Sequence, residues 1–298
     1  MVNFLIFVNL LKAKMSKKRV FQKIRKLISD SDPKVAVINL SGVIGVKSKM
    51  DQGINFDNVN PLLEDAFKVK NLKAVAINVN SPGGSPVQSE LIFKRIRELS
   101  KEKKIPTYTF AQDVAASGGY FILLAGDKIY GHNSSIIGSI GVISAGFGFE
   151  ELIKKIGVER RVYAQGKNKA VLDPFLPEKE ENITILKEAQ KDVFESFKEL
   201  VKSCRGVENL KESDDYLFNG AFWSGKKAMD LGLIDGISDA REILKEKFGT
   251  KIKFVEIKAK KKGILKELLA SRSNIGADFA QEAVSKIEER AIYSRFGL

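Results

Sequence analysis

An alternation of apolar runs and helical patterns over the first 111 residues constrains the fold more than any other feature. Three runs rich in β-branched or apolar residues indicate buried strands at Val35–Ile44, Leu72–Val79 and Thr107–Ala111. Amphipathic helical patterns lie between them, at Pro61–Lys70 and Val87–Lys101. Strands that alternate with helices favour a parallel sheet flanked by helices. The predicted fold class is therefore α/β.

The rest of the chain extends this pattern and then changes character. Short strands are predicted at Lys128–Tyr130, Arg160–Gln165 and Lys251–Ile257, with a long amphipathic helix over Glu178–Cys204. We therefore divide the chain into three parts: an apolar and basic N-terminal segment (1–30), one α/β domain (31–250) and a basic amphipathic helical tail (251–298).

The net charge of +13 is concentrated near the two ends of the chain. Residues 1–26 hold eight Lys or Arg and no acid, residues 251–272 hold eight against two acids, and the part between is nearly neutral. A nucleic-acid face should spread basic residues over a folded surface, so we expect no nucleic-acid partner. Two local basic segments fit an anionic membrane surface, although solvated charge that binds nothing explains them equally well.

The apolar run Met1–Leu11 precedes the first basic cluster. It is about half the length that a membrane-spanning helix needs, and its charge follows the apolar run, the reverse of a signal peptide. We expect a peripheral anchor on the cytoplasmic face of the inner membrane, or otherwise a cytoplasmic protein.

Few sites can be built from histidine or cysteine, because the chain has one of each, His132 and Cys204. No disulfide within the chain is possible, and no cysteine metal cluster is expected. His132 stands in the polar string Gly131-His132-Asn133-Ser134, which indicates a surface loop. We expect neither a metal nor a cofactor.

Ser117 is the candidate nucleophile. It lies in the small-residue stretch Val114–Tyr120, which predicts a tight turn into a buried helix whose N-terminus would favour a developing negative charge. An ordinary turn with no catalytic role is the alternative interpretation.

The turn Pro82-Gly83-Gly84 follows the strand at 72–79 and can present backbone N–H donors at the edge where open α/β sheets bind ligands. Gly118 would supply a second donor, and the base would be His132 or a lysine whose pKa burial lowers.

Five segments, in order, resemble the signal peptide peptidase A family of serine peptidases, which has the Clp protease/crotonase type of fold. The resemblance covers about residues 35–245 and rests on Asn80-Ser81-Pro82-Gly83-Gly84, Ala115-Ala116-Ser117-Gly118-Gly119-Tyr120, Gly138-Ser139-Ile140-Gly141-Val142, Gly166-Lys167-Asn168-Lys169, and Phe222-Trp223-Ser224-Gly225 with Gly232-Leu233-Ile234-Asp235. It implies that 31–250 is a peptidase domain. Members of the family often carry a full membrane-spanning helix at the N-terminus, from which this chain departs.

The resemblance also implies the site residues. Ser117 would be the nucleophile, Lys169 the general base, and Ser139 the residue that orients the lysine, with the N–H groups of Gly84 and Gly118 as the oxyanion hole. Asn168 stands where the family has a tyrosine. An extended backbone would put Lys167 and Lys169 on one face, so the choice of Lys169 follows from the resemblance alone.

The resulting hypothesis is a serine endopeptidase with a Ser/Lys dyad that cleaves peptides, such as remnant signal peptides, through an acyl-enzyme. One chain holds both dyad residues and could complete the dyad within one subunit, and the resemblance implies a homo-oligomer. A crotonase-like acyl-CoA enzyme is one alternative, since it also uses two N–H donors. A catalytically inactive scaffold at a membrane surface is the other.

Overall fold

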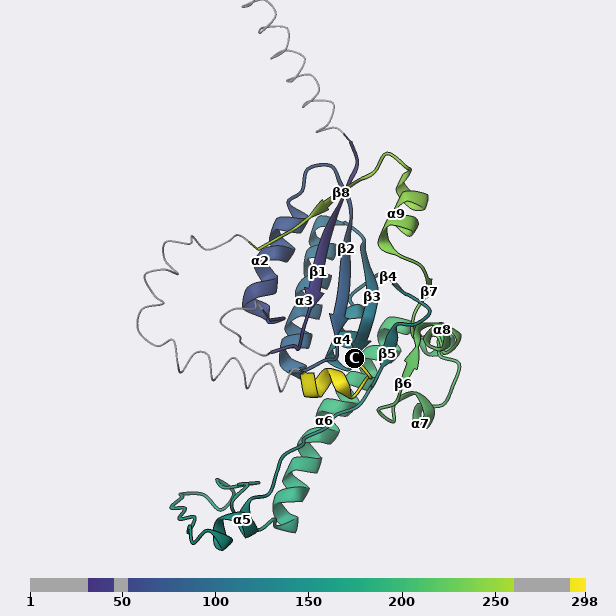
Figure 1. Ribbon diagram of the computed structural model, residues 1–298. Helices are drawn as coiled ribbons and strands as arrows, with labels where there is room; N and C mark the ends of the chain where they lie inside the picture. Colours follow the sequence, from purple (N-terminus) through teal and green to yellow (C-terminus); the bar gives the residue numbers. More distant parts are fainter. Residues whose placement is uncertain (1–31, 46–52, 260–289) are drawn as a thin grey trace, which may run out of the picture.

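A mainly parallel β-sheet forms the centre of the molecule in the computed structural model, which describes residues 32–45, 53–259 and 290–298 (Figure 1). Its order is β6-β5-β3-β2-β1-β8, and β4 joins β3 to β7. The pairs are parallel except β5 with β6. The strands are β1 (Lys34–Ser41), β2 (Leu72–Ser81), β3 (Thr107–Ala116), β4 (Lys128–Gly131), β5 (Ile136–Gly138), β6 (Phe222–Ser224), β7 (Gly236–Ile237) and β8 (Lys253–Glu256).

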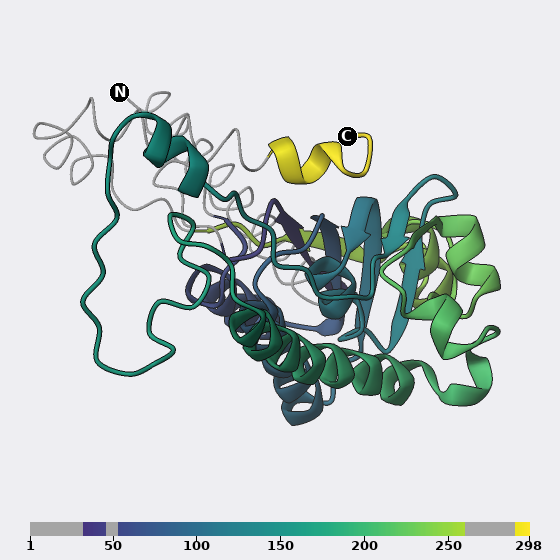
Figure 2. The ribbon, with the colours of Figure 1, turned by 90° about the horizontal axis from the view of Figure 1, so that it is seen from below.

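Helices cover both faces of this sheet (Figure 2). They are α2 (Phe56–Phe67), α3 (Pro86–Lys103), α4 (Gly118–Leu123), α5 (Glu150–Lys155), α6 (Glu180–Arg205), α7 (Asp214–Leu217), α8 (Gly225–Asp230) and α9 (Ala240–Phe248), with a 3₁₀ turn at Val207–Asn209. The main core lies between the sheet and α2, α3, α4 and α6, and a smaller core lies under α9. The predicted α/β class is confirmed.

The alternation of side chains along β1 explains the two cores. Ala36, Ile38 and Leu40 belong to the main core, whereas Val35 packs in the core under α9. Successive side chains of a strand point to opposite faces, so a strand that is apolar at both positions has to be covered on both sides. The sequence of β1 therefore requires helices on both faces.

Residues 144–179, which we call the arm, lie at the far end of α6, away from the sheet (Figure 1). The strand predicted at Arg160–Gln165 is wrong, because this part of the arm is irregular and continues into turns over 165–172. A strand needs a neighbour to bond its backbone. Here Arg160 pairs with Asp173 and Arg161 with Glu159, both inside the arm.

The N-terminal segment 1–30 and most of the tail lie outside the described residues, so the divisions predicted there remain predictions. Among the helices that the structure describes, none is long and apolar enough to cross a membrane. The last nine residues return to the sheet face opposite α4. Phe296 packs on Val114 and Ala116 there, and the Tyr293 hydroxyl donates to the Asn80 carbonyl at 3.2 Å.

Asp235 ties the segment between α8 and β7 to the sheet. Its carboxylate accepts hydrogen bonds from the Ile129 N–H at 2.8 Å, from Arg205 at 2.9 Å and from Lys128 at 3.0 Å. Burial alone would raise the pKa of Asp235, but the hydrogen bonds from Arg205 and from the Ile129 N–H outweigh burial and hold that pKa below its ordinary value. The folded state therefore stabilises the ionised carboxylate of Asp235 relative to the protonated form.

Asp235→Asn should lower the free energy of unfolding at pH 7 by about 2 kcal/mol, because the half-buried Arg205 loses its carboxylate partner and keeps only its bond to the Gly232 carbonyl. A depressed folded-state pKa stabilises above the unfolded value of about 3.9 and stops doing so as pH falls through the folded value. The difference from wild type should therefore shrink below about pH 4. Urea unfolding at pH 7 and pH 3 measures it, with the exposed Asp230→Asn as control. Equal stability of the two variants at pH 7 would contradict the prediction.

Candidate active site

Ser117 lies at the end of β3, where the chain turns into α4, in a conformation that few side chains adopt. Its φ is 51° and its ψ is −119°. Backbone bonds hold it there: its N–H donates to the Gly138 carbonyl at 2.8 Å, and its carbonyl accepts from the Phe121 N–H at 3.0 Å. A non-glycine residue with positive φ costs free energy and persists where surrounding contacts enforce it. Such strain concentrates at active sites.

The turn after β2 approaches Ser117 so closely that it needs glycine. A Cβ on Gly83, whose φ is 109°, would lie 2.8 Å from the Ser117 Cβ and 3.0 Å from the Gly118 nitrogen. β2 and β3 are neighbouring parallel strands, so their carboxyl ends meet at this edge. The sequence analysis predicted the turn Pro82-Gly83-Gly84 at this edge of the sheet, and the structure places it there.

The Gly84 and Gly118 nitrogens lie near each other at this edge. The Gly84 nitrogen is 3.4 Å from the place of a Cβ on Gly118, and Gly84 is exposed while Gly118 is buried. Among the described residues, neither N–H donates to a hydrogen bond. Two such N–H groups beside a strained serine are the donors that an oxyanion needs.

Ser139 lies beside Ser117 across the sheet, because Ala116 of β3 is in register with Gly138 of β5. Its φ is also 51°, and its N–H donates to the Ala221 carbonyl at 2.7 Å. The side chain is half-buried. The two serines therefore follow the ends of adjacent strands, and both have a positive φ of 51°.

Lys169 lies elsewhere, on the arm. It is exposed, and its N–H donates to the Gly166 carbonyl at 3.1 Å within a turn. The assumption of an extended backbone at Lys167 and Lys169 is therefore wrong. Within one chain, the described residues do not bring Lys169 beside Ser117, since the arm projects from the body along α6 (Figure 1).

The structure distinguishes the two lysines of the arm electrostatically. The Lys167 ammonium lies 2.9 Å from a Glu181 carboxylate oxygen, and this hydrogen bond raises the pKa of Lys167. A general base needs the opposite direction. Lys169 has no ion pair within the part of the chain that the structure describes.

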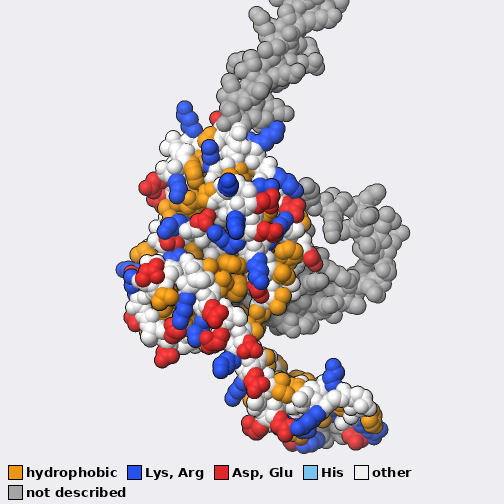
Figure 3. All heavy atoms as spheres, turned by 180° about the vertical axis from the view of Figure 1, so that it is seen from behind, with side chains coloured by type: hydrophobic (Ala, Val, Ile, Leu, Met, Phe, Trp, Pro, Cys, Tyr) orange, Lys and Arg blue, Asp and Glu red, His pale blue; other side chains and the backbone are white. Residues whose placement is uncertain are grey.

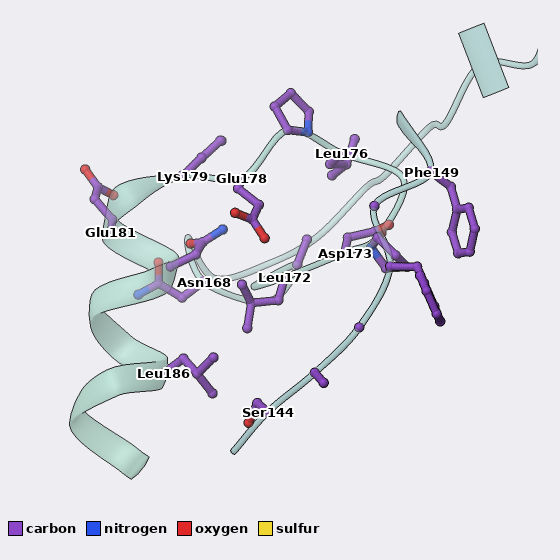
Figure 4. A pocket seen from close by; sticks show the side chains of 18 of the residues that line it. Ser144, Phe149, Asn168, Leu172, Asp173, Leu176, Glu178, Lys179, Glu181 and Leu186 are labelled. Carbon is purple, nitrogen blue, oxygen red and sulfur yellow. The ribbon is translucent and has the colours of Figure 1, made fainter. Parts of the chain in front are cut away.

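The arm and the start of α6 enclose a cavity of about 530 Å³ (Figure 4). Leu172 and Asn168 of the arm and Leu186 of α6 line it. Ser117 and Ser139 do not line it. The cavity therefore belongs to the arm and is separate from the strand ends that carry the two serines.

The remaining chemistry-bearing residues stand apart from Ser117. His132 is exposed, as its loop predicts, beside a groove under α9 that Asn39 and Arg241 also line. Cys204 is exposed and unbridged. In the described ranges, no three His, Cys, Asp or Glu side chains gather as a metal site.

Sequence analysis missed a third segment at the site. Residues 42–45, which follow β1, contact the glycine turn: the Ile44 N–H donates to the Gly83 carbonyl at 2.8 Å. Its only sequence signal is that β1 ends at the same edge as its parallel neighbour β2.

Comparison with known proteins places this arrangement in a family. The profile of peptidase family S49 matches residues 99–252, just over half of the chain. A putative signal peptide peptidase SppA of Enterococcus faecium is 29% identical over 250 residues, which cover 81% of this chain and 72% of that protein. A mutant of the 1510-N membrane-bound stomatin-specific protease, solved in complex with a substrate peptide, matches at 18% identity and a TM-score of 0.49, over 80% of this chain and 98% of that one.

A second relative has a different kind of name. A Brucella abortus protein named Na(+)/H(+) antiporter NhaA is 44% identical over 277 residues, which cover 90% of this chain. This chain spans 37% of the length of that protein. About two thirds of that protein therefore lies outside the match, and its name says nothing about this chain.

Proposed function

This chain belongs to peptidase family S49, and we propose that it is a serine endopeptidase in which Ser117 is the nucleophile. The observation that carries the proposal is the placement of Ser117, held at positive φ beside the N–H groups of Gly84 and Gly118. These donors suit the oxygen that becomes negative when a hydroxyl attacks a peptide carbonyl.

In the proposed mechanism, Lys169 acts as the general base. Its neutral amine takes the proton of the Ser117 hydroxyl as the Ser117 oxygen bonds to the scissile carbon. The tetrahedral oxyanion accepts from Gly84 and Gly118 N–H groups. The lysine ammonium then gives the proton to the leaving amine, the C–N bond breaks, and an acyl-enzyme remains. The same lysine then deprotonates a water, whose oxygen bonds to the acyl carbon. The ester bond to Ser117 breaks, the lysine returns the proton to the Ser117 oxygen, and the acid product leaves.

The position of the arm favours a site that is completed between two copies of the chain. Lys169 lies on the arm, and apolar side chains reach the surface of the arm among charged ones (Figure 3). The large exposed apolar side chains there include Phe147 (80% exposed), Ile156 (66%) and Tyr163 (92%). Exposed apolar side chains grouped on one projection indicate a protein contact. We infer that the arm of one copy packs against another and brings Lys169 to the partner copy's nucleophile, where Ser139 orients the amine.

The proposed substrates are peptides with apolar segments, such as remnant signal peptides. The name of the E. faecium relative supports this class. The eight basic residues within 1–26 support attachment to an anionic membrane surface, and we propose the cytoplasmic face of the inner membrane.

A fluorophosphonate probe tests the function directly, with mass spectrometry to find the labelled residue. Labelling at Ser117, together with cleavage of an apolar peptide, supports the endopeptidase. An unlabelled wild type would favour the inactive scaffold. Turnover of a CoA thioester that survives Ser117→Ala would favour the crotonase-like enzyme instead.

A further inference from the structure

We propose that Ile44 is a positioning residue that fixes the two oxyanion donors relative to each other. The inference rests on the proposed function, because it concerns the same oxyanion hole. The donors belong to different segments, Gly84 to the turn after β2 and Gly118 to the start of α4. Ile44, after β1, contacts both segments.

The backbone of Ile44 holds the glycine turn on both sides of Gly84. The Ile44 N–H donates to the Gly83 carbonyl at 2.8 Å, and the Ile44 carbonyl accepts from the Ser85 N–H at 2.9 Å. The Gly83 carbonyl and the Gly84 N–H belong to one trans peptide, so the first bond turns the Gly84 N–H away from Ile44. The second bond fixes the next peptide plane. The approach is so close that a Cβ on Gly84 would lie 2.1 Å from the Ile44 carbonyl oxygen.

The side chain of Ile44 reaches the other donor. Its Cδ1 lies 3.2 Å from the place of a Cβ on Gly118. The Ser89 Oγ lies 2.5 Å from the same place, and the Ser89 hydroxyl donates to the Ser85 carbonyl at 2.9 Å. Gly118 is thus held against two buried side chains, of which Ile44 is 2% exposed.

Ile44 is itself fixed from the side away from the glycines. It bridges Ile54, and the Gly45 N–H donates to the Ile54 carbonyl at 2.8 Å. When one methyl group is removed from a densely packed interior, the neighbouring side chains relax only partly and a small cavity remains. Loss of Cδ1 therefore lets Gly118 shift relative to Gly84, while the Ile44 backbone bonds remain.

The test compares Ile44→Val with Ile96→Val. Both substitutions remove one Cδ1 methyl from an isoleucine of the main core, and Ile96 is fully buried on α3. We measure kcat and KM on an apolar peptide, the affinity for a peptide aldehyde, whose hemiacetal oxygen enters the oxyanion hole, and the Tm. The full chain is used throughout.

For Ile44→Val we expect kcat and aldehyde affinity to fall about tenfold, a fraction of the loss caused by a 1 Å misplacement or a missing donor. KM should stay unchanged, and Tm should match that of Ile96→Val, whose kcat should equal wild type. Equal kcat and equal aldehyde affinity in the two variants would overturn the inference and leave the proposed function intact. A wild type that no fluorophosphonate labels would overturn the proposed function itself.

Discussion

Ser117→Ala is expected to abolish peptide hydrolysis and fluorophosphonate labelling, with a fall in kcat of about a millionfold. The hydroxyl oxygen is the atom that forms the acyl-enzyme, and water near the Gly84 and Gly118 donors replaces it poorly. The fold should persist, because alanine keeps the backbone bonds to Gly138 and Phe121. Labelling followed by mass spectrometry and a progress curve on an apolar peptide measure the loss.

Ser139→Ala is the matched control for this variant. Ser139 also has a φ of 51° and also follows a strand at the same edge, so both variants place alanine at a positive φ that strains the backbone. Its expected loss is smaller, about tenfold to a hundredfold, because Ser139 positions the lysine and forms no bond to the substrate. Labelling that persists in Ser117→Ala would remove Ser117 from the mechanism.

The contacts at the strand ends were predictable because one rule of parallel sheets produces them. β2 and β3 are neighbours and run the same way, so the turn at Pro82–Gly84 and the turn at Ser117 meet at one edge. β1 ends there too, so the same rule points to Ile44. Ile44 was predicted as the last residue of that strand, which in the structure ends at Ser41. An apolar residue at a strand end carries no chemical signal of its own, so its contact with the site was missed.

The arm was not predictable from local pattern. Arg160–Gln165 has the composition of a strand, yet a strand forms only where another strand accepts its backbone bonds, and none lies beside the arm among the described residues. The antiparallel pairing of β6 with β5 was missed because it too depends on a neighbouring strand, which the local sequence pattern does not show. The position at which Lys169 acts depends on contacts with other segments. The periodicity of apolar residues in the sequence contains no information about such contacts.

Lys169→Ala should reduce kcat roughly ten-thousandfold, the upper range for loss of a general base. Lys167→Ala is the control. It removes the same charge two residues away, from an ammonium paired with Glu181 and a pKa raised by that pair. Its kcat should stay near wild type. The labelling rate with a fluorophosphonate separates the two variants, and a loss confined to Lys167→Ala would make Lys167 the base.

Mixing Ser117→Ala with Lys169→Ala then tests where the dyad forms. If the arm acts between copies, some contacts in a mixed assembly join an intact Ser117 to an intact Lys169 from the other variant. With equal amounts and random exchange, about a quarter of the sites are complete, and activity returns to about that fraction of wild type. A dyad within one chain can gain nothing by mixing, because each variant lacks one of its members. A mixture that stays inactive after subunit exchange would therefore place Lys169 beside the Ser117 of its own chain and require the arm to fold back toward the sheet.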